Sequence, residues 1–296
     1  KLFHRFYEIK RKKLKLKKMR RFDLYAPIKA KKEKKVPYDK AMKMVLECYE
    51  SFHPKFKENA LKIINAKHIH SKIQKNKQSG AFCCGITTTI PPFVLLNYTG
   101  TLRDVSTIAH ELGHGVHHIL ASCQTEFTND AVLPLAETAS IFGEMLLSEK
   151  IMEKDPQKAK ELIFYKLDDL YASIIRQAGF VAFEIKAHQM MKEGKTIDEM
   201  SAVYLQDLRK QLGPKVEVDE IFAYEWSYIP HIFHTPFYCY AYAFGNLLVL
   251  ALWEMYKEKG KPFAEKIIKM LAAGSSKSPV DITKAVGVDI TSEKFW

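Results

Sequence analysis

The residues best suited to chemistry are His110, Glu111 and His114, which form a His-Glu-x-x-His pattern. Residues four apart lie on the same face of a helix, so His110 and His114 can direct their imidazoles at one ion. Glu111 is rotated by about 100° from His110, so it can reach a water held by that ion rather than act as a ligand on the same ridge. This spacing predicts a zinc hydrolase. The alternative is a packed helix with ordinary surface histidines, but Gly113 and Gly115 lower the helix propensity that such a helix would favour.

A catalytic zinc ion needs a third protein ligand and an open position for water. Glu137 is the best candidate, because it follows a polar loop that can turn the chain back and because its neighbours are mostly apolar. Glu126, Glu144 and Asp130 stay open as alternatives. Glu144 lies seven residues after Glu137, on the same helix face, and is also expected to hydrogen-bond a ligand histidine from outside the ligand group.

The elements that must position these residues are mainly helical. A helix is predicted over 102–122, which carries the histidines, and another over 131–150, which carries Glu137. The β signal is confined to 76–98, where the β-branched run 86–90 and the segment 93–98 predict two strands of a small antiparallel sheet. The fold class is therefore mainly α, with further helices expected at 4–21, 39–51, 54–66, 156–193, 196–212, 238–259, 262–273 and 280–286.

The positive charge is concentrated at the start of the chain. The 296 residues carry a formal charge of +12, yet residues 1–40 hold 17 Lys and Arg against 4 Asp and Glu, and the remainder is nearly neutral. We interpret 1–40 as a basic leading helix with a solvated face and a linker, part of the catalytic domain, which continues over 41–296. A nucleic-acid-binding arm is disfavoured because the segment lacks the aromatic or glycine-rich companions that stacking on bases requires.

Cysteine usage and hydropathy bear on the compartment. The five cysteines include no CxxC pair and their number is odd, which favours a reducing compartment over a disulfide framework. The longest apolar stretch, 237–253, contains three tyrosines and an asparagine and does not predict a membrane span. No signal peptide is evident, so the sequence is interpreted as a soluble, cytoplasmic protein without membrane or nucleic-acid partners.

Four runs of sequence resemble the oligoendopeptidase F family of zinc metallopeptidases, relatives of thimet oligopeptidase. They are SGAFCCG, PPFVLLNYTGTLRDVSTIAHELGHGVHH, LPLAETASIFGEMLL and WSYIPHIFHTPFYCYAYAFGNLLVLAL. The resemblance implies a zincin-type helical catalytic domain that cleaves internal bonds of short peptides with one zinc ion. Family members have a further N-terminal helical region that is absent here, so the resemblance implies a catalytic fragment or an unusually short homologue.

The resemblance also implies roles for individual residues. His110, His114 and Glu137 match the zinc ligands, and Glu111 matches the general base. His231 and Tyr240 match groups that stabilise the transition state, although Phe233 stands where many relatives have a tyrosine. The strand at Gly80, Ala81 and Phe82 resembles the edge strand along which substrates lie, and Tyr238 and His234 are expected to contact substrate.

Three other functions remain compatible with the residues alone. A metallocarboxypeptidase or aminopeptidase would use the same histidine-bearing helix but would also need a charged group to hold a peptide terminus. An inactive, zinc-containing binding fragment would keep the ligands without turnover. A nucleic-acid-binding protein would use the basic residues of 1–40.

Overall fold

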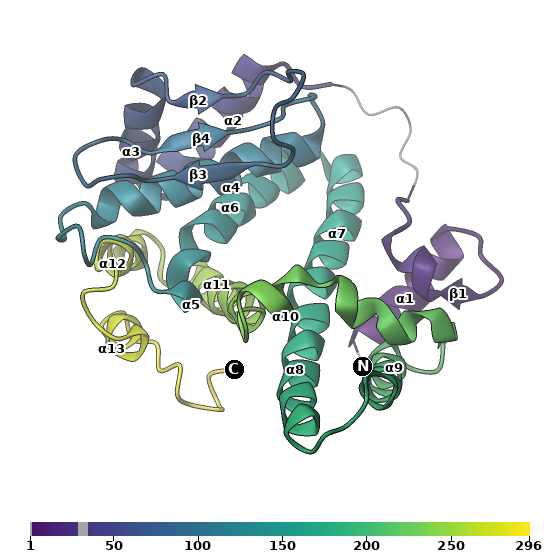
Figure 1. Ribbon diagram of the computed structural model, residues 1–296. Coiled ribbons are helices and arrows are strands. Elements are labelled where there is room, and N and C mark those ends of the chain that lie inside the picture. The colour runs from purple at the N-terminus through teal and green to yellow at the C-terminus, as the bar shows by residue number, and fades with distance from the viewer. Residues whose placement is uncertain (1, 29–34) are drawn as a thin grey trace. The chain divides into compact units, whose positions relative to one another are not determined.

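Helices make up most of this chain in the computed structural model, which describes residues 2–28 and 35–296, without the side chains of 156–161 (Figure 1). The predicted class, mainly α with a small sheet, is confirmed. The chain forms two compact units. The first unit comprises Lys1–Lys31 and Lys160–Phe244, and the second comprises Lys32–Ala159 and Gly245–Trp296. Most of the predicted basic linker, residues 29–34, lies outside the described residues.

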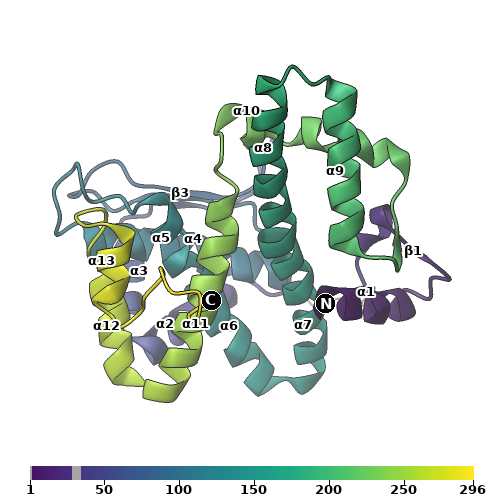
Figure 2. The same cartoon turned by 90° about the horizontal axis from the view of Figure 1, so that it is seen from below.

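The second unit is built around two adjacent helices, α4 (Leu102–Ala121) and α6 (Thr138–Lys154), which share its most extensive contact (Figures 1 and 2). The neighbouring helices begin and end close to their predicted bounds, because their apolar positions recur at helical spacing. They are α2 (Tyr38–Phe52), α3 (Pro54–Asn65), α12 (Lys261–Leu271), α13 (Pro279–Lys284) and most of α11 (Tyr240–Lys259). The unit also contains the short helix α5 (Leu133–Ala136), which was not predicted as a separate helix.

A three-stranded sheet in the order β2-β4-β3 belongs to the second unit. The strand predicted over 93–98 is present in part as β4 (Phe93–Leu95), but its antiparallel partner is β3 (Phe82–Cys84) and not the predicted segment 86–90. The two-residue strand β2 (Ile69–His70) was not predicted and pairs with β4 in the parallel sense, so the sheet is mixed. In this order β3 is an edge strand: β4 pairs with one side of its backbone, and no described strand pairs with the other side.

The prediction of a strand over 86–90 is wrong, because local hydrogen bonds replace the ladder there. The Thr87 hydroxyl accepts bonds from the N–H groups of Thr89 and Ile90, which folds the backbone into a turn. The N–H and hydroxyl of Thr88 both donate to Glu126. Threonine side chains can compete with a strand in this way despite their high β-propensity.

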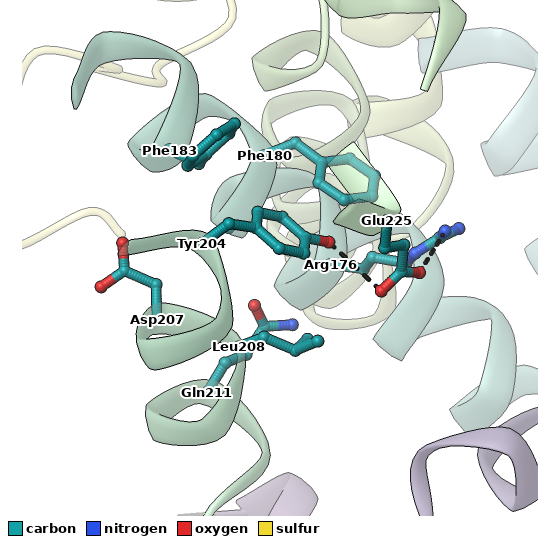
Figure 3. A pocket seen from close by; sticks show the side chains of 9 residues that line it. Arg176, Phe180, Phe183, Tyr204, Asp207, Leu208, Gln211 and Glu225 are labelled. Carbon is teal, nitrogen blue, oxygen red and sulfur yellow. Dashed lines mark hydrogen bonds and ion pairs between the residues drawn. The ribbon is translucent and has the colours of Figure 1, made fainter. Parts of the chain in front are cut away.

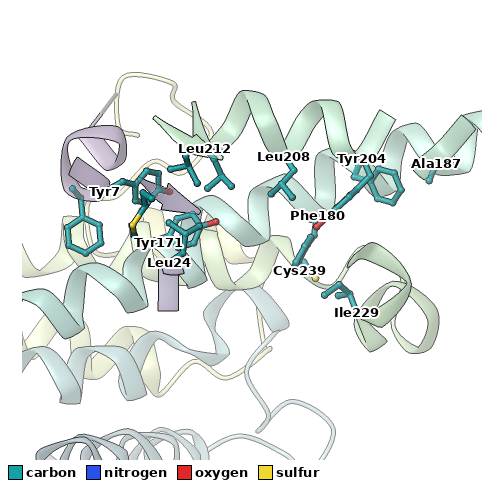
Figure 4. Close-up of a cluster of buried hydrophobic side chains, with 14 of the residues drawn as sticks. Tyr7, Leu24, Tyr171, Phe180, Ala187, Tyr204, Leu208, Leu212, Ile229 and Cys239 are labelled. Carbon is teal, nitrogen blue, oxygen red and sulfur yellow. The ribbon is translucent and has the colours of Figure 1, made fainter. Parts of the chain in front are cut away.

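The first unit packs helices around an aromatic core. It contains α1 (Leu2–Lys13), β1 (Met19–Arg20), η1 (Arg21–Tyr25), α9 (Ile197–Leu212), β5 (Val216–Glu217), η3 (Glu220–Tyr228) and α10 (Pro230–His234). The predicted helix at 156–193 is present as α7 (Pro156–Leu170), a wider π-helical turn η2 (Tyr171–Arg176) and α8 (Gln177–Lys192). Figure 4 shows Tyr7, Tyr171, Phe180 and Tyr204 gathered in the buried cluster between these elements.

The leading helix is shorter than predicted and does not have a fully solvated basic face. It ends at Lys13, Lys15 adopts a positive φ of 57°, and Met19–Arg20 instead pairs with Val216–Glu217 as a parallel strand. Lys10 is completely buried and donates to both carboxylate oxygens of Asp168 at 2.6 and 2.7 Å. At least one lysine of the basic segment 1–40 is therefore not solvated but forms a buried ion pair that anchors α1.

Among the described residues, no helix combines the length and apolarity that crossing a bilayer would demand.

Candidate metal centre

Helix α4 begins with a capping box that sets the orientation of its histidines. Thr101 accepts a hydrogen bond from the N–H of Asp104, and the Asp104 carboxylate accepts one from the N–H of Thr101. Ile108 and Leu112 are fully buried on the core side of the helix. The predicted start of this helix is confirmed, and the burial of its apolar stripe leaves His110 and His114 on a partly exposed face.

Glu137 stands at a break in the second predicted helix. The segment predicted as one helix over 131–150 is divided into α5 and α6, and Glu137 lies between them with φ −84° and ψ 0°. Its side-chain oxygen Oε2 accepts a hydrogen bond of 2.9 Å from the hydroxyl of Ser140 in the first turn of α6. The break and this bond aim the carboxylate back towards α4.

Two glycines allow α4 and α6 to approach closely enough for Glu137 to reach the histidines. A Cβ on Gly113 of α4 would lie 2.6 Å from the Ser140 Cα and 2.7 Å from the Ala139 carbonyl oxygen. A Cβ on Gly143 of α6 would lie 2.8 Å from the Ala109 carbonyl oxygen. Glycine at these two positions lowers the helix propensity, but it allows the backbones of α4 and α6 to touch.

The three predicted ligands come together. Nε2 of His110 and Nε2 of His114 are 3.2 Å apart, and each lies 3.4 Å from Oε2 of Glu137. A tetrahedral zinc site with ligands about 2.0–2.1 Å from the ion separates its ligand atoms by about 3.3–3.4 Å. The residues present therefore fit a zinc ion. Within the described part of the chain, this is the one group of three or more His, Cys, Asp or Glu side chains arranged to hold a metal.

The alternative third ligands lie elsewhere. Glu126 is bonded to Thr88 in the turn that precedes β4. Asp130 is 92% exposed, and its Oδ1 lies 3.7 Å from Nδ1 of His118. Neither belongs to the ligand group.

Glu144 contacts the ligand His110 from outside the group. Its Oε1 lies 2.7 Å from Nδ1 of His110, which leaves Nε2 free to face Glu137. The hydroxyl of Ser106 donates to the other oxygen of Glu144 at 3.0 Å. Sequence reasoning named Glu144 in this position but missed Ser106, although its spacing of four residues before His110 places both on one helix face.

The electrostatics of the group favour an ionised carboxylate. Burial by itself would raise the pKa of Glu137, but the hydrogen bond and charge of His114 and the charge of His110 lower that pKa to about 2. Burial would lower the pKa of His110, but the hydrogen bond and charge of Glu144 raise it to about 9. The cluster thus holds Glu137 in the charged form that a metal ligand requires.

Glu111 is next to this group without being part of it. It is 7% exposed, and burial is the main reason that its pKa is raised above the ordinary value for a glutamate. A raised pKa suits a group that must accept a proton and then release it near neutral pH.

The segment around β3 packs against the face of α4 that carries Gly115, where a Cβ would lie 3.6 Å from Sγ of Cys83. Burial raises the pKa of the Cys83 thiol to about 12, which favours the protonated thiol near neutral pH. Phe82 opens the edge strand and is 38% exposed. Gly80 and Ala81 precede it, and the Gly80 carbonyl accepts a hydrogen bond from Asn97.

The predicted transition-state residues, His231 and Tyr240, lie in the first unit, where His231 contacts Tyr238 and Tyr242 rather than Tyr240. The ring of His231 stacks on Tyr238 with centroids 5.4 Å apart, and its Nε2 lies 3.3 Å from the Tyr242 hydroxyl. Tyr240 is 41% exposed and His234 is also exposed, and neither joins this stack. The placement of His231 and Tyr240 against the ligand group stays a prediction.

The element before His231 is fixed by a buried carboxylate, Glu225 of η3. Figure 3 shows Glu225 accepting hydrogen bonds from Arg176 at 3.1 Å and from the Tyr204 hydroxyl at 3.2 Å, and Arg21 of η1 also donates to it. The cavity beside this network is about 10 Å³, space for about one water molecule. Glu225 therefore ties η3, and with it the start of α10, to the core of the first unit.

Comparisons with known proteins agree along the full chain. Residues 1–296 match Peptidase family M3. The chain is 32% identical over 298 residues to an oligoendopeptidase F homolog of Borreliella burgdorferi, an alignment that covers 97% of this chain and 50% of the relative. It is 29% identical over 296 residues to oligopeptidase PepF of Bacillus subtilis, covering 98% of this chain and 44% of that protein.

The crystal structure of oligoendopeptidase-F from Enterococcus faecium has a TM-score of 0.72 and 25% identity to this chain. The match covers 99% of this chain and 46% of that one. The chain spans about half the length of the curated relatives it matches.

Proposed function

Because this chain belongs to peptidase family M3, we propose that it is a zinc-dependent endopeptidase that hydrolyses internal bonds of short oligopeptides. The observation that carries the proposal is the convergence of His110, His114 and Glu137, whose atoms have the separations of three ligands in a tetrahedral site. One zinc ion held there would polarise the scissile carbonyl and lower the pKa of its bound water towards neutrality.

Glu111 is the proposed general base. It takes the proton of the attacking water and then transfers it to the leaving amine, so that one buried carboxylate serves both halves of the reaction. Its position one residue after His110 and its raised pKa support this role. Glu144 and Ser106 keep the imidazole of His110 in the orientation that presents Nε2.

His231 and Tyr240 are proposed to donate hydrogen bonds to the oxygen of the scissile carbonyl as it becomes negative. The resemblance of the segment 226–245 to the family supports this assignment. Tyr238 and His234 are proposed to contact the substrate, and the segment Gly80, Ala81 and Phe82, which leads into the edge strand β3, is proposed to pair with its backbone. The same proposal assigns the catalytic residues to the predicted domain 41–296.

The five cysteines are free thiols, which supports a reducing, cytoplasmic compartment as part of the proposal.

The test is turnover of an internally quenched peptide blocked at both ends. Purified protein loaded with one equivalent of zinc should cleave it, and a chelator should abolish cleavage. Glu111→Gln should keep its zinc but lose activity by about 10²–10⁴-fold, because only the proton acceptor is removed. The matched control is Glu126→Gln, which changes an exposed carboxylate outside the ligand group and should cleave normally.

Other results of the peptide assay would favour one of the alternative functions. Cleavage of free-ended peptides but not of blocked ones would indicate a carboxypeptidase or aminopeptidase. Stoichiometric zinc binding without turnover of either peptide would indicate a binding fragment. Full activity of Glu111→Gln would refute the proposed mechanism.

A further inference from the structure

Glu184, on α8, is a buried carboxylate that the proposed chemistry does not use. Its side chain is 1% exposed. Oε1 accepts a hydrogen bond of 2.8 Å from the backbone N–H of Phe237, whereas Oε2 is buried and has no hydrogen-bond partner among the described residues. The imidazole of His188, one turn further along α8, has its Nε2 4.0 Å from Oε1, and the His188 side chain is 42% exposed.

The residue that Glu184 contacts has an unusual backbone. Phe237 adopts φ 60°, in the left-handed region, which is unfavourable for a residue with a side chain. It lies in the short connection between α10 and α11, and its ring packs on His188 with centroids 4.9 Å apart. A conformation of this kind persists only where the surroundings hold it.

The connection between α10 and α11 determines how the aromatic stack is arranged. Tyr238 follows Phe237 directly and stacks on His231, and Tyr242, in the first turn of α11, contacts both rings. A change in the backbone at Phe237 would rotate Tyr238 away from His231. The stack therefore depends on the bond that Glu184 makes.

Stability alone does not account for a carboxylate at this place. A buried charge with one hydrogen bond and one unpartnered oxygen is costly to the folded state, and an apolar residue of similar volume would avoid that cost. Placing a strong acceptor under the N–H of Phe237 is the one benefit visible in the contacts.

We propose that Glu184 is a positioning residue, whose carboxylate holds Phe237 in its left-handed conformation and thereby fixes the His231, Tyr238 and Tyr242 stack for catalysis. The effect of Glu184 on catalysis rests on the proposed function, whereas its effect on the conformation of Phe237 does not.

The test compares Glu184→Met, which keeps the volume but removes the acceptor, with Glu184→Gln, which retains an acceptor oxygen. Leu208→Ala, in the core of the same unit, is the control for lost stability without a change at Phe237. For each protein we would measure zinc content, thermal unfolding, kcat and KM on the blocked peptide, and hydrogen exchange of the segment 235–239.

Glu184→Met is expected to bind zinc normally and to unfold at an equal or higher temperature. Its kcat should nevertheless fall by about 10-fold or more with KM little changed, because small displacements of catalytic groups carry large rate penalties. Exchange in 235–239 should accelerate. Glu184→Gln should restore slow exchange and most of kcat, and Leu208→Ala should lower the unfolding temperature without changing kcat per folded molecule.

The inference is overturned if Glu184→Met shows unchanged exchange, or a kcat that falls only with the folded fraction. If Glu184→Met does not fold, hydrogen exchange of the wild-type protein tests the inference. The Phe237 amide must then exchange far more slowly than an amide in a free loop, and rapid exchange would refute its hydrogen bond to Glu184. A wild-type protein that cleaves no peptide would refute the proposed function, while the exchange measurements would still decide whether Glu184 holds Phe237.

Discussion

The contact between α4 and α6 leads to a quantitative prediction for Gly113→Ala. A methyl group at Gly113 would lie 2.6 Å from the Cα of Ser140, whereas carbon atoms in contact are normally about 3.5–4.0 Å apart. Helix α6 must therefore retreat by about 1 Å. Glu137 is only three residues from Ser140 and its carboxylate is bonded to that residue, so the ligand moves with the helix.

This displacement exceeds what a zinc site tolerates. Metal–ligand distances deviate from their ideal values by only about 0.2 Å in a well-formed site, so a shift of about 1 Å weakens the third ligand. We expect zinc affinity to fall by about 10–100-fold, the range found when groups around metal ligands are changed. The overpacking should cost about 1–3 kcal/mol of stability, partly offset by about 1 kcal/mol from the better helix propensity of alanine.

The assay is competition for zinc with a chromogenic chelator, combined with thermal unfolding of the metal-free protein. The matched control is Gly115→Ala on the same helix, which gains the same helix propensity but meets the terminal methyl of Ile63 rather than a backbone. A methyl tip can rotate aside, so Gly115→Ala should bind zinc almost as the wild type does. Equal zinc affinities for the two variants would refute the reasoning.

Two further predictions concern buried titratable groups. Burial lowers the pKa of His117 to about 4, below the value of about 6.5 in an unfolded chain, so the unfolded state binds more protons and stability should fall by about 3 kcal/mol as pH drops from 6.5 to 4. Urea unfolding of the protein in the presence of a chelator should show this fall in the free energy of unfolding with pH, and His117→Gln should reduce it. The same pH dependence in both proteins would contradict the role given to His117. Lys10→Met should cost about 3 kcal/mol in urea unfolding, since it leaves Asp168 without its partner, and Lys10→Met with Asp168→Asn should recover much of that loss. A double variant no more stable than Lys10→Met would count against the ion pair.

The convergence of His110, His114 and Glu137 could be predicted from the sequence because its geometry is mostly local. The spacing of His110 and His114 needs only one regular helix, and the capping residues of α4 could be read directly. Glu137 was identified from its apolar surroundings, but its position at a break between helices was not predicted, because no glycine or proline marks the interruption after Ala136.

The failures come from contacts between distant residues. The basic segment after Lys13 continues a plausible helical pattern, yet pairing with Val216–Glu217, nearly 200 residues later, makes Met19–Arg20 a strand. The burial of Lys10 depends on Asp168, which no local pattern connects to α1. The bond between Glu184 and Phe237 likewise has no local sequence signal, because it requires the fold to bring α8 against the α10–α11 connection.

If β3 pairs with a peptide as proposed, its shortness limits how tightly it can hold that peptide. Three residues span about 10 Å and offer at most two or three outward backbone groups, each worth about 0.5–1.5 kcal/mol net. Such an edge contributes only millimolar affinity by itself. Fragments that retain nothing but these backbone bonds should dissociate quickly, so product release from this strand would not limit turnover.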